Sequence, residues 1–108
     1  MKETLIQSAI ETYLGFQENL GKLVFIKNNS GAYKTAHGSF VRFGKAGSPD
    51  FFVFLPGEIK VIHLEVKNEK GQLNANQKEY KNRIEKIGHQ YVVVRGVDEV
   101  ENLIKGKI

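Results

Sequence analysis

The middle of the chain, residues 49–67, reads PDFFVFLPGEIKVIHLEVK. Its first part, Phe51 to Leu55, is an uninterrupted apolar run, which is typical of a strand buried on both faces. Pro56-Gly57 is a turn dipeptide. From Lys60 to Lys67 apolar and polar residues alternate, and this period of two predicts a second strand with one face toward the core. The stretch therefore predicts an antiparallel hairpin of two central strands.

Three charged residues gather at one end of this hairpin. Glu65 and Lys67 lie on the same face of the second strand because side chains alternate. Asp50 heads the first strand, so antiparallel pairing brings it to the end of the hairpin where Glu65 lies. Two carboxylates at one place form the oxygen-only site that Mg²⁺ or Mn²⁺ prefers, and a neighbouring lysine can orient a water or stabilise charge on a phosphate. This set suits phosphodiester cleavage better than glycoside cleavage, which has no use for the lysine.

The Glu-x-Lys triplet is a weak signal by itself, because the chain contains it three times. Glu58-Ile59-Lys60 falls at the hairpin turn, and Glu79-Tyr80-Lys81 falls within a predicted helix, where positions i and i+2 diverge. Only residues 65–67 have apolar neighbours at alternate positions and a Pro-Asp pair on the adjoining strand. The surrounding pattern, rather than the triplet, carries the functional prediction.

Further elements surround the hairpin. Apolar residues at helical spacing predict a helix over residues 4–20, with Thr4 and Gln7 placed to form a capping box. Asn74 and Gln77 form a second capping pair, at the start of a helix that runs to Gly88 as its C-cap. The remaining expectations are strands at Leu23–Lys27, Phe40–Phe43 and Gln90–Arg95, a turn at Asn28–Gly31 and a short helix at Asp98–Ile104. The order helix, four strands, helix, strand, helix predicts one α/β domain over residues 1–108, with a mixed central sheet flanked by helices.

Composition excludes several classes of protein. The 108 residues, 41% hydrophobic and 26% charged, fit one ordinary globular domain. The absence of cysteine excludes disulfides, thiolate metal sites and cysteine nucleophiles, and the three separated histidines do not suggest a zinc site. No apolar run approaches the roughly 18 residues that a bilayer span needs, and the acidic, polar N-terminus is unlike a signal peptide. We therefore expect a cytoplasmic domain with no membrane association and no organic cofactor.

The net charge of +4 is unevenly distributed along the chain. No acidic residue occurs between Asn19 and Pro49, and aromatic residues are interleaved with the basic ones there. Such a stretch suits contact with a phosphate backbone, because each basic side chain can displace a condensed counterion. The alternative interpretation is a solubilising surface. The expected nucleic-acid contacts are Lys34, Arg42 and Lys45.

In their order along the chain, these motifs resemble the virus-type replication-repair nuclease (VRR-NUC) group of the PD-(D/E)xK nuclease superfamily. The resemblance runs nearly end to end and rests on the sum of several short motifs. These are Glu3-x-x-Ile6-Gln7-x-x-Ile10-x-x-Tyr13-Leu14, Asn28-Asn29-x-Gly31-Ala32, Gly44-Lys45-x-Gly47-Ser48-Pro49-Asp50, Glu65-Val66-Lys67, Gly71-x-Leu73-x-x-x-Gln77 and Gly88. His89 departs from the family pattern, in which many relatives carry a second glycine.

The resemblance implies a fold, a cofactor and an activity. The fold is the restriction-endonuclease-like core in the order α-β-β-β-β-α-β-α. The activity is hydrolysis of DNA phosphodiester bonds by an endonuclease that needs Mg²⁺ or Mn²⁺. Asp50 and Glu65 would hold the metal together with the backbone carbonyl of Val66, and Lys67 would position the attacking water or the developing charge. Gln77 would contact the active site, although helix capping explains this glutamine equally well.

The family also places an acidic residue of the first helix near the metal. Glu3 and Gln7 lie on one face of that helix, aimed with Ile10 toward the sheet. Glu3 is the favoured acid and a candidate metal ligand, but a true N-cap at Thr4 would leave it outside the first turn. Glu11 is the alternative, because it lies about 40° around the helix from Gln7. His63 and Tyr80, by contrast, are expected to be packing residues.

The free-standing members of the family resemble Holliday-junction resolvases that act as dimers in DNA repair. We therefore expect a homodimer that prefers branched or junction DNA, in a bacterium or a phage-infected cell. Two alternatives remain: a non-catalytic module that binds DNA or junctions, and a restriction-type nuclease of the same superfamily. The absence of an added recognition domain argues against the second. Apolar residues left over from the core would form the dimer interface, among Phe40, Phe43, Phe51 and Phe52.

Overall fold

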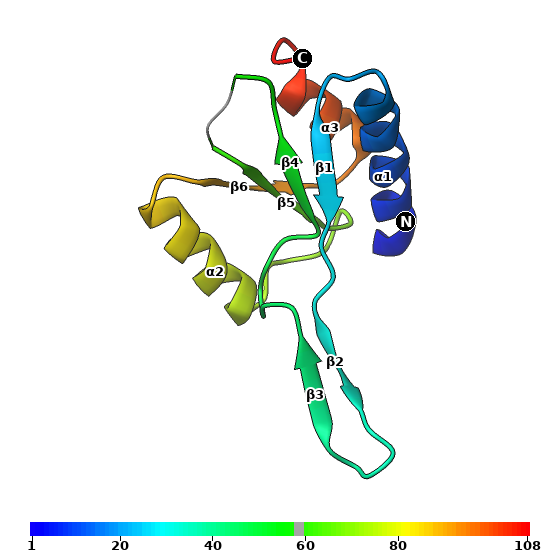
Figure 1. Ribbon diagram of the computed structural model, residues 1–108, viewed down its shortest axis with the longest axis vertical. Helices are drawn as coiled ribbons and strands as arrows, with labels where there is room; N and C mark the ends of the chain where they lie inside the picture. The colour runs from blue at the N-terminus through cyan, green and yellow to red at the C-terminus, as the bar shows by residue number, and fades with distance from the viewer. Residues whose placement is uncertain (58–59) are drawn as a thin grey trace.

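The computed structural model describes residues 1–57 and 60–108. Its elements are α1 (Glu3–Asn19), β1 (Val24–Lys27), β2 (Gly31–Lys34), β3 (Phe40–Phe43), β4 (Phe51–Phe54), β5 (Ile62–Val66), α2 (Ala75–Lys86), β6 (Gln90–Val94) and α3 (Val97–Ile104). Four strands form a central sheet in the order β1-β4-β5-β6. The β5–β6 pair is parallel and the other two pairs are antiparallel, so the sheet is mixed. The predicted α/β class with a mixed central sheet between helices is confirmed (Figure 1).

The hydrophobic core lies between this sheet and two of the helices. Phe51 and Leu64 are paired across β4 and β5 and are fully buried. Against them pack Ile10 and Leu14 of α1, which are also fully buried, together with Val100 of α3. The helix α2 covers the opposite face, at the β5 and β6 side of the sheet (Figure 1). All five residues of β5 are buried, as expected for a strand with elements on both faces.

The central hairpin is present with the predicted pairing. Because Phe51 pairs with Leu64, the neighbouring Asp50 and Glu65 come to the same end of the two strands. The second strand is shorter than predicted and begins at Ile62. Glu58-Ile59-Lys60, the triplet expected at the turn, lies partly outside the described residues.

One part of the strand prediction is wrong. Residues 31–43 form a separate two-stranded antiparallel ribbon of β2 and β3, which we call the arm, and it projects from the body (Figure 1). Phe40–Phe43 is therefore a strand but does not belong to the central sheet, and Gly31, expected in a turn, begins β2. All eight strand residues of the arm are exposed, so no buried apolar pattern marked β2 in the sequence.

The helix starts differ in how they are capped. Asn74 and Gln77 form the predicted capping box at the start of α2. The capping box predicted for Thr4 and Gln7 is wrong, because α1 begins at Glu3 with Lys2 as its N-cap and no side chain caps it. This start places Glu3 in the first turn of α1.

No helix in the described part of the chain is long and apolar enough to cross a membrane.

Candidate active site

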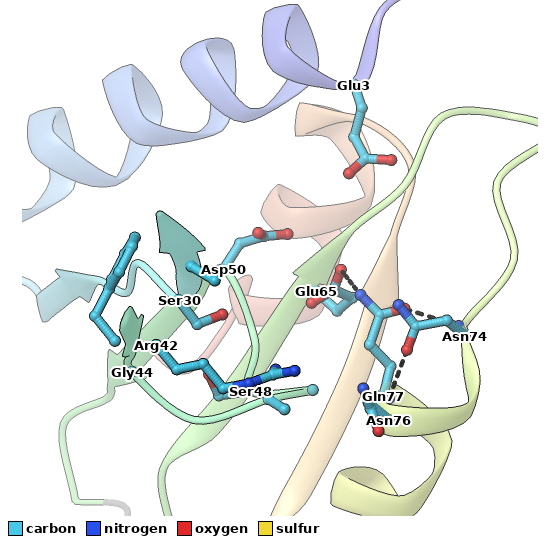
Figure 2. A pocket seen from close by; sticks show the side chains of 15 residues that line it. Glu3, Ser30, Arg42, Gly44, Ser48, Asp50, Glu65, Asn74, Asn76 and Gln77 are labelled. Carbon is cyan, nitrogen blue, oxygen red and sulfur yellow. Dashed lines mark hydrogen bonds between the residues drawn. The ribbon is translucent and has the colours of Figure 1, made fainter. Parts of the chain in front are cut away.

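A cavity of about 370 Å³ opens where the two central strands meet the base of the arm and the start of α2. Asp50 and Glu65 line it from the sheet, Glu3 from the first turn of α1, Arg42 from the arm and Gln77 from α2 (Figure 2). Other polar side chains of its wall are Ser30, Ser48, Asn74 and Asn76. Residues from α1, the arm, β5, α2 and the loop before β4 therefore meet at one polar cavity.

Asp50, just before β4, is held by two hydrogen bonds. The side-chain amide of Gln7 donates to Oδ1 at 2.9 Å, and the backbone N–H of Val66 donates to Oδ2 at 2.7 Å. Burial raises the pKa of Asp50 above its usual range; the Val66 N–H opposes the rise and the charge of Glu3 adds to it. The carboxylate is thus fixed in orientation while it remains part of the cavity wall.

Glu65 lies on β5 and is only 2% exposed. Its Oε2 accepts a hydrogen bond of 3.1 Å from the Gln77 amide and lies 3.6 Å from Nζ of Lys67. Burial, followed by the nearby charge of Asp50, raises the pKa of Glu65 to about 8, although the Lys67 ammonium opposes the rise. Two acids and one lysine therefore share a small volume with little solvent, which is costly unless a cation or a ligand also binds there.

Of the two acids considered on the first helix, Glu3 is the one at the cavity. Its side chain lies across the cavity from the Gln77 side chain (Figure 2), and its charge raises the pKa of both Asp50 and Glu65. Glu11 instead pairs with Lys27 at 3.3 Å and does not line the cavity. Among residues 1–57 and 60–108, no three acidic or histidine side chains stand close enough to form a metal-binding group by themselves.

Gln77 performs both functions that its sequence position suggested. Its Oε1 accepts the backbone N–H of Asn74 at 3.0 Å, which completes the capping box. Its Nε2 donates to Glu65. Because an amide carries an acceptor and a donor at opposite ends, one side chain can cap α2 and restrain Glu65 together.

Asn28, which the sequence places in a turn and in one of the family motifs, holds the loop before Asp50 in position. The side-chain amide of Asn28 donates to Ser48 Oγ at 2.8 Å and to the Pro49 carbonyl at 2.9 Å. The Asn28 backbone N–H also donates to the Asp50 carbonyl at 2.8 Å. Asn28 therefore joins the end of β1 to the loop that carries Asp50.

The remaining residues expected at the site are distributed over the surface around the cavity. Arg42 reaches the cavity, Lys34 stands on the arm away from its wall, and Lys45 lines a neighbouring depression. His63 is buried beneath α2, where its Nδ1 lies 2.9 Å from the hydroxyl of Tyr80. Burial and His89 lower the pKa of His63, which agrees with the expectation of a packed, hydrogen-bonded histidine.

One contact at the site was missed at the level of sequence. The sequence pattern indicates a capping role for Gln7, whereas its side chain donates a hydrogen bond to Asp50, 43 positions further along the chain. Its spacing from Glu3 and Ile10 placed it on the face toward the sheet, but the sequence contains no signal for the partner it meets there.

Comparison with known proteins agrees with this arrangement. The profile of the VRR-NUC domain family matches residues 21–98. A solved structure described as a VRR-NUC domain superposes with a TM-score of 0.65 over 98% of this chain and 97% of that chain, at 24% sequence identity. That likeness shows a shared fold. No curated protein is significantly similar to the chain. The profile match covers well over half of the sequence, and the chain therefore belongs to the VRR-NUC domain family, whose members are nuclease domains that act on DNA.

Proposed function

We propose that this domain is a divalent-metal-dependent endonuclease that hydrolyses phosphodiester bonds of branched DNA. The observation that carries the proposal is the meeting of Asp50, Glu65 and Lys67 at one end of the central hairpin. Arg42 lines the cavity that Asp50 and Glu65 also line. The carboxylates are suited to a hard cation and the cationic groups to a phosphate. Glycoside cleavage also uses two carboxylates, but it does not need the lysine that stands beside Glu65 here.

The donor set fits a Mg²⁺ or Mn²⁺ ion. Asp50 and Glu65 supply carboxylate oxygens at the cavity wall. The N–H of Val66 is directed at Asp50, and in an extended strand the carbonyl of the same residue is directed to the same side. Val66 would therefore offer its carbonyl oxygen, and Glu3, which lines the same cavity, would contribute through a water. A bound ion would polarise the phosphate and lower the pKa of a bound water.

The role of Lys67 is to position the attacking water or to stabilise the charge that develops on the phosphate. Its side chain is almost fully buried, and its stem passes over Gly71, where an added Cβ would lie only 3.2 Å from Lys67 Cδ. The ammonium group is therefore held beside Glu65 in a restricted position. A positioned cation of this kind stabilises charge in a transition state without reorganising.

The arm supplies contacts to DNA and to a second copy of the chain. Lys34 and Arg42 occupy one face of this ribbon, and Tyr33, Val41 and Phe43 occupy the other. An isolated two-stranded ribbon is only marginally stable, so the exposed apolar face favours a homodimer. Two copies related by a two-fold axis would present two active sites to a junction that is itself nearly two-fold symmetric.

A cleavage assay tests the proposed activity. Labelled duplex, flap, single-stranded and four-way-junction DNA would be incubated with the protein in Mg²⁺, Mn²⁺ or EDTA. We expect cleavage with either metal and none in EDTA, and loss of at least about 100-fold in rate for Asp50→Asn and Glu65→Gln because each removes a charge from the site. Glu11→Gln is the matched control, since Glu11 pairs with Lys27 outside the cavity. DNA binding without cleavage under all conditions would instead identify a non-catalytic binding module.

A further inference from the structure

A second depression, of about 230 Å³, adjoins the active-site cavity. It lies between the loop at residues 44–47 and the side of α2. Its wall is formed by Lys45, Ala46, Asn76, Glu79, Tyr80 and Arg83. Ala46 and Asn76 also belong to the active-site cavity, so the two hollows share a boundary.

Beside this boundary the backbone of Gly47 packs against the backbone of Asn76. Gly47 has a φ of 81° and packs so closely on the backbone carbonyl of Asn76 that a Cβ there would clash with it. This contact joins the loop to the first turn of α2, which the Asn74–Gln77 capping box also orders. A strand leaving the active-site cavity over this boundary would pass directly into the second depression.

The second depression has cationic groups on both of its sides. Lys45 comes from the loop, and Arg83 comes from α2, where it lies two turns beyond Asn76 on the same helix face. Arg83 donates to Glu79 at 2.8 Å, and both side chains are exposed, at 68% and 62%. Exposed pairs of this kind contribute little to stability, so Arg83 can exchange its carboxylate partner for a phosphate at small cost.

We infer that this depression binds a backbone phosphate of the DNA strand next to the segment held in the active-site cavity. The inference rests on the proposed function for the nature of the ligand, and it assigns Arg83 and Lys45 as its contacts. Glu79 is a competing anion, which holds Arg83 when no DNA is bound. The two residues should therefore affect DNA affinity in opposite directions.

The test measures DNA binding in the Asp50→Asn background, so that cleavage does not interfere. Fluorescence anisotropy with a labelled four-way junction would be recorded across a range of salt concentrations without divalent metal. Arg83→Gln should weaken binding by roughly 3- to 10-fold at low salt and reduce the salt slope by about one. Glu79→Gln should strengthen binding several-fold, because it releases Arg83 and removes a negative charge near the phosphate.

The chain contains a matched control for both variants. Lys81 and Glu85 form another i,i+4 ion pair on the same helix, at 3.0 Å and in the reverse order of charges, but neither lines the depression. Lys81→Gln and Glu85→Gln repeat the two charge changes, and we expect each to alter affinity less than twofold. Equal effects for the two pairs would show that only net charge matters, and would overturn the assignment of Arg83 as a phosphate contact. An unchanged DNA affinity in Arg83→Gln, or no binding of DNA at all, would overturn it as well.

Failure of this inference and failure of the proposed function are distinguishable. Metal-dependent cleavage is measured on the wild-type protein, whereas phosphate binding is measured on a variant that lacks Asp50. Cleavage with no selective effect of Arg83 would overturn the phosphate site alone. A selective effect of Arg83 without any cleavage would overturn the nuclease mechanism alone.

Discussion

Glu65 is almost fully buried beside a second acid, unlike an ordinary surface glutamate. Burial and the charge of Asp50 raise the pKa of Glu65 from 4.5 to about 8. Between pH 4.5 and pH 8, Glu65 therefore keeps its proton in the folded protein, whereas the unfolded chain has released it. The folded state therefore loses stability as pH rises from about 5 to 8. We expect the metal-free protein to show a Tm that falls by several degrees over this range in a thermal melt.

Two comparisons test the origin of this pH dependence. Glu65→Gln removes the titrating group, so its Tm should change less over the same range. Mn²⁺ at pH 8 should raise the wild-type Tm, because a ligand that binds only the folded state stabilises it. A wild-type Tm that rises steadily from pH 5 to 8 without metal would contradict the assignment of the raised pKa to Glu65.

Gly47 is a second residue whose role depends on its surroundings. It combines a positive φ with close packing on Asn76, whereas Gly21 has a similar φ of 75° and open space around it. Gly47→Ala should cost about 2 kcal/mol or more in unfolding free energy, and Gly21→Ala about 1 kcal/mol, since only the first adds a clash to the backbone strain. Urea unfolding of the two variants measures the difference. Equal losses would mean that the loop can move away from α2.

At the scale of secondary-structure elements, α2 has two separable functions. Its capping box orders the first turn, and the same turn carries Gln77 to Glu65. Asn74→Ala should lower the unfolding free energy by about 1 kcal/mol, while Asn74→Ser should restore most of it because serine is also a good N-cap. Chemical denaturation followed by circular dichroism measures both variants. If the alanine variant were as stable as wild type, the capping box would not contribute to the stability of α2.

The arm is the element whose exposure most needs an explanation. Phe40 is 74% exposed, Tyr33 55% and Phe43 45% on a ribbon that does not pack into the core. Of the four phenylalanines expected at an interface, Phe51 is instead fully buried in the core and Phe52 is partly buried against His63. Of the four, only Phe40 and Phe43 are therefore exposed, and Phe43 alone lies on the face of the arm that carries Tyr33 and Val41.

At the scale of the whole molecule, the arm extends the chain to 50 Å along one axis against 31 and 28 Å along the others. We expect light scattering at micromolar concentration to give the mass of a homodimer. Replacing Tyr33 and Val41 together with serine should produce a monomer, because both lie on the apolar face of the arm. Phe40→Ser, on the opposite face, is the control and should remain dimeric. A wild-type mass equal to one chain, with junction cleavage retained, would refute the dimer.

Much of the central sheet and of its acidic end could be predicted from the sequence. Alternation along residues 60–67 and the Pro56-Gly57 turn were sufficient to bring Asp50 opposite Glu65, and Phe51 does pair with Leu64. The capping box of α2 was equally visible, since Asn74 and Gln77 are three residues apart. These features depend on neighbours in sequence or on a short hairpin, where chain geometry restricts the register.

Other features depend on how separate elements pack, and local patterns do not contain that information. The contact of Gln7 with Asp50, the choice of Glu3 over Glu11 and the approach of Arg42 all require the rotation of α1 and the direction of the arm. The sequence of the arm shows no alternation of buried apolar and exposed polar residues, because none of its strand residues is buried. The packing of α1 against the sheet and the projection of the arm away from the sheet both depend on contacts between residues far apart in the sequence. These two features place the groups that surround Asp50 and Glu65.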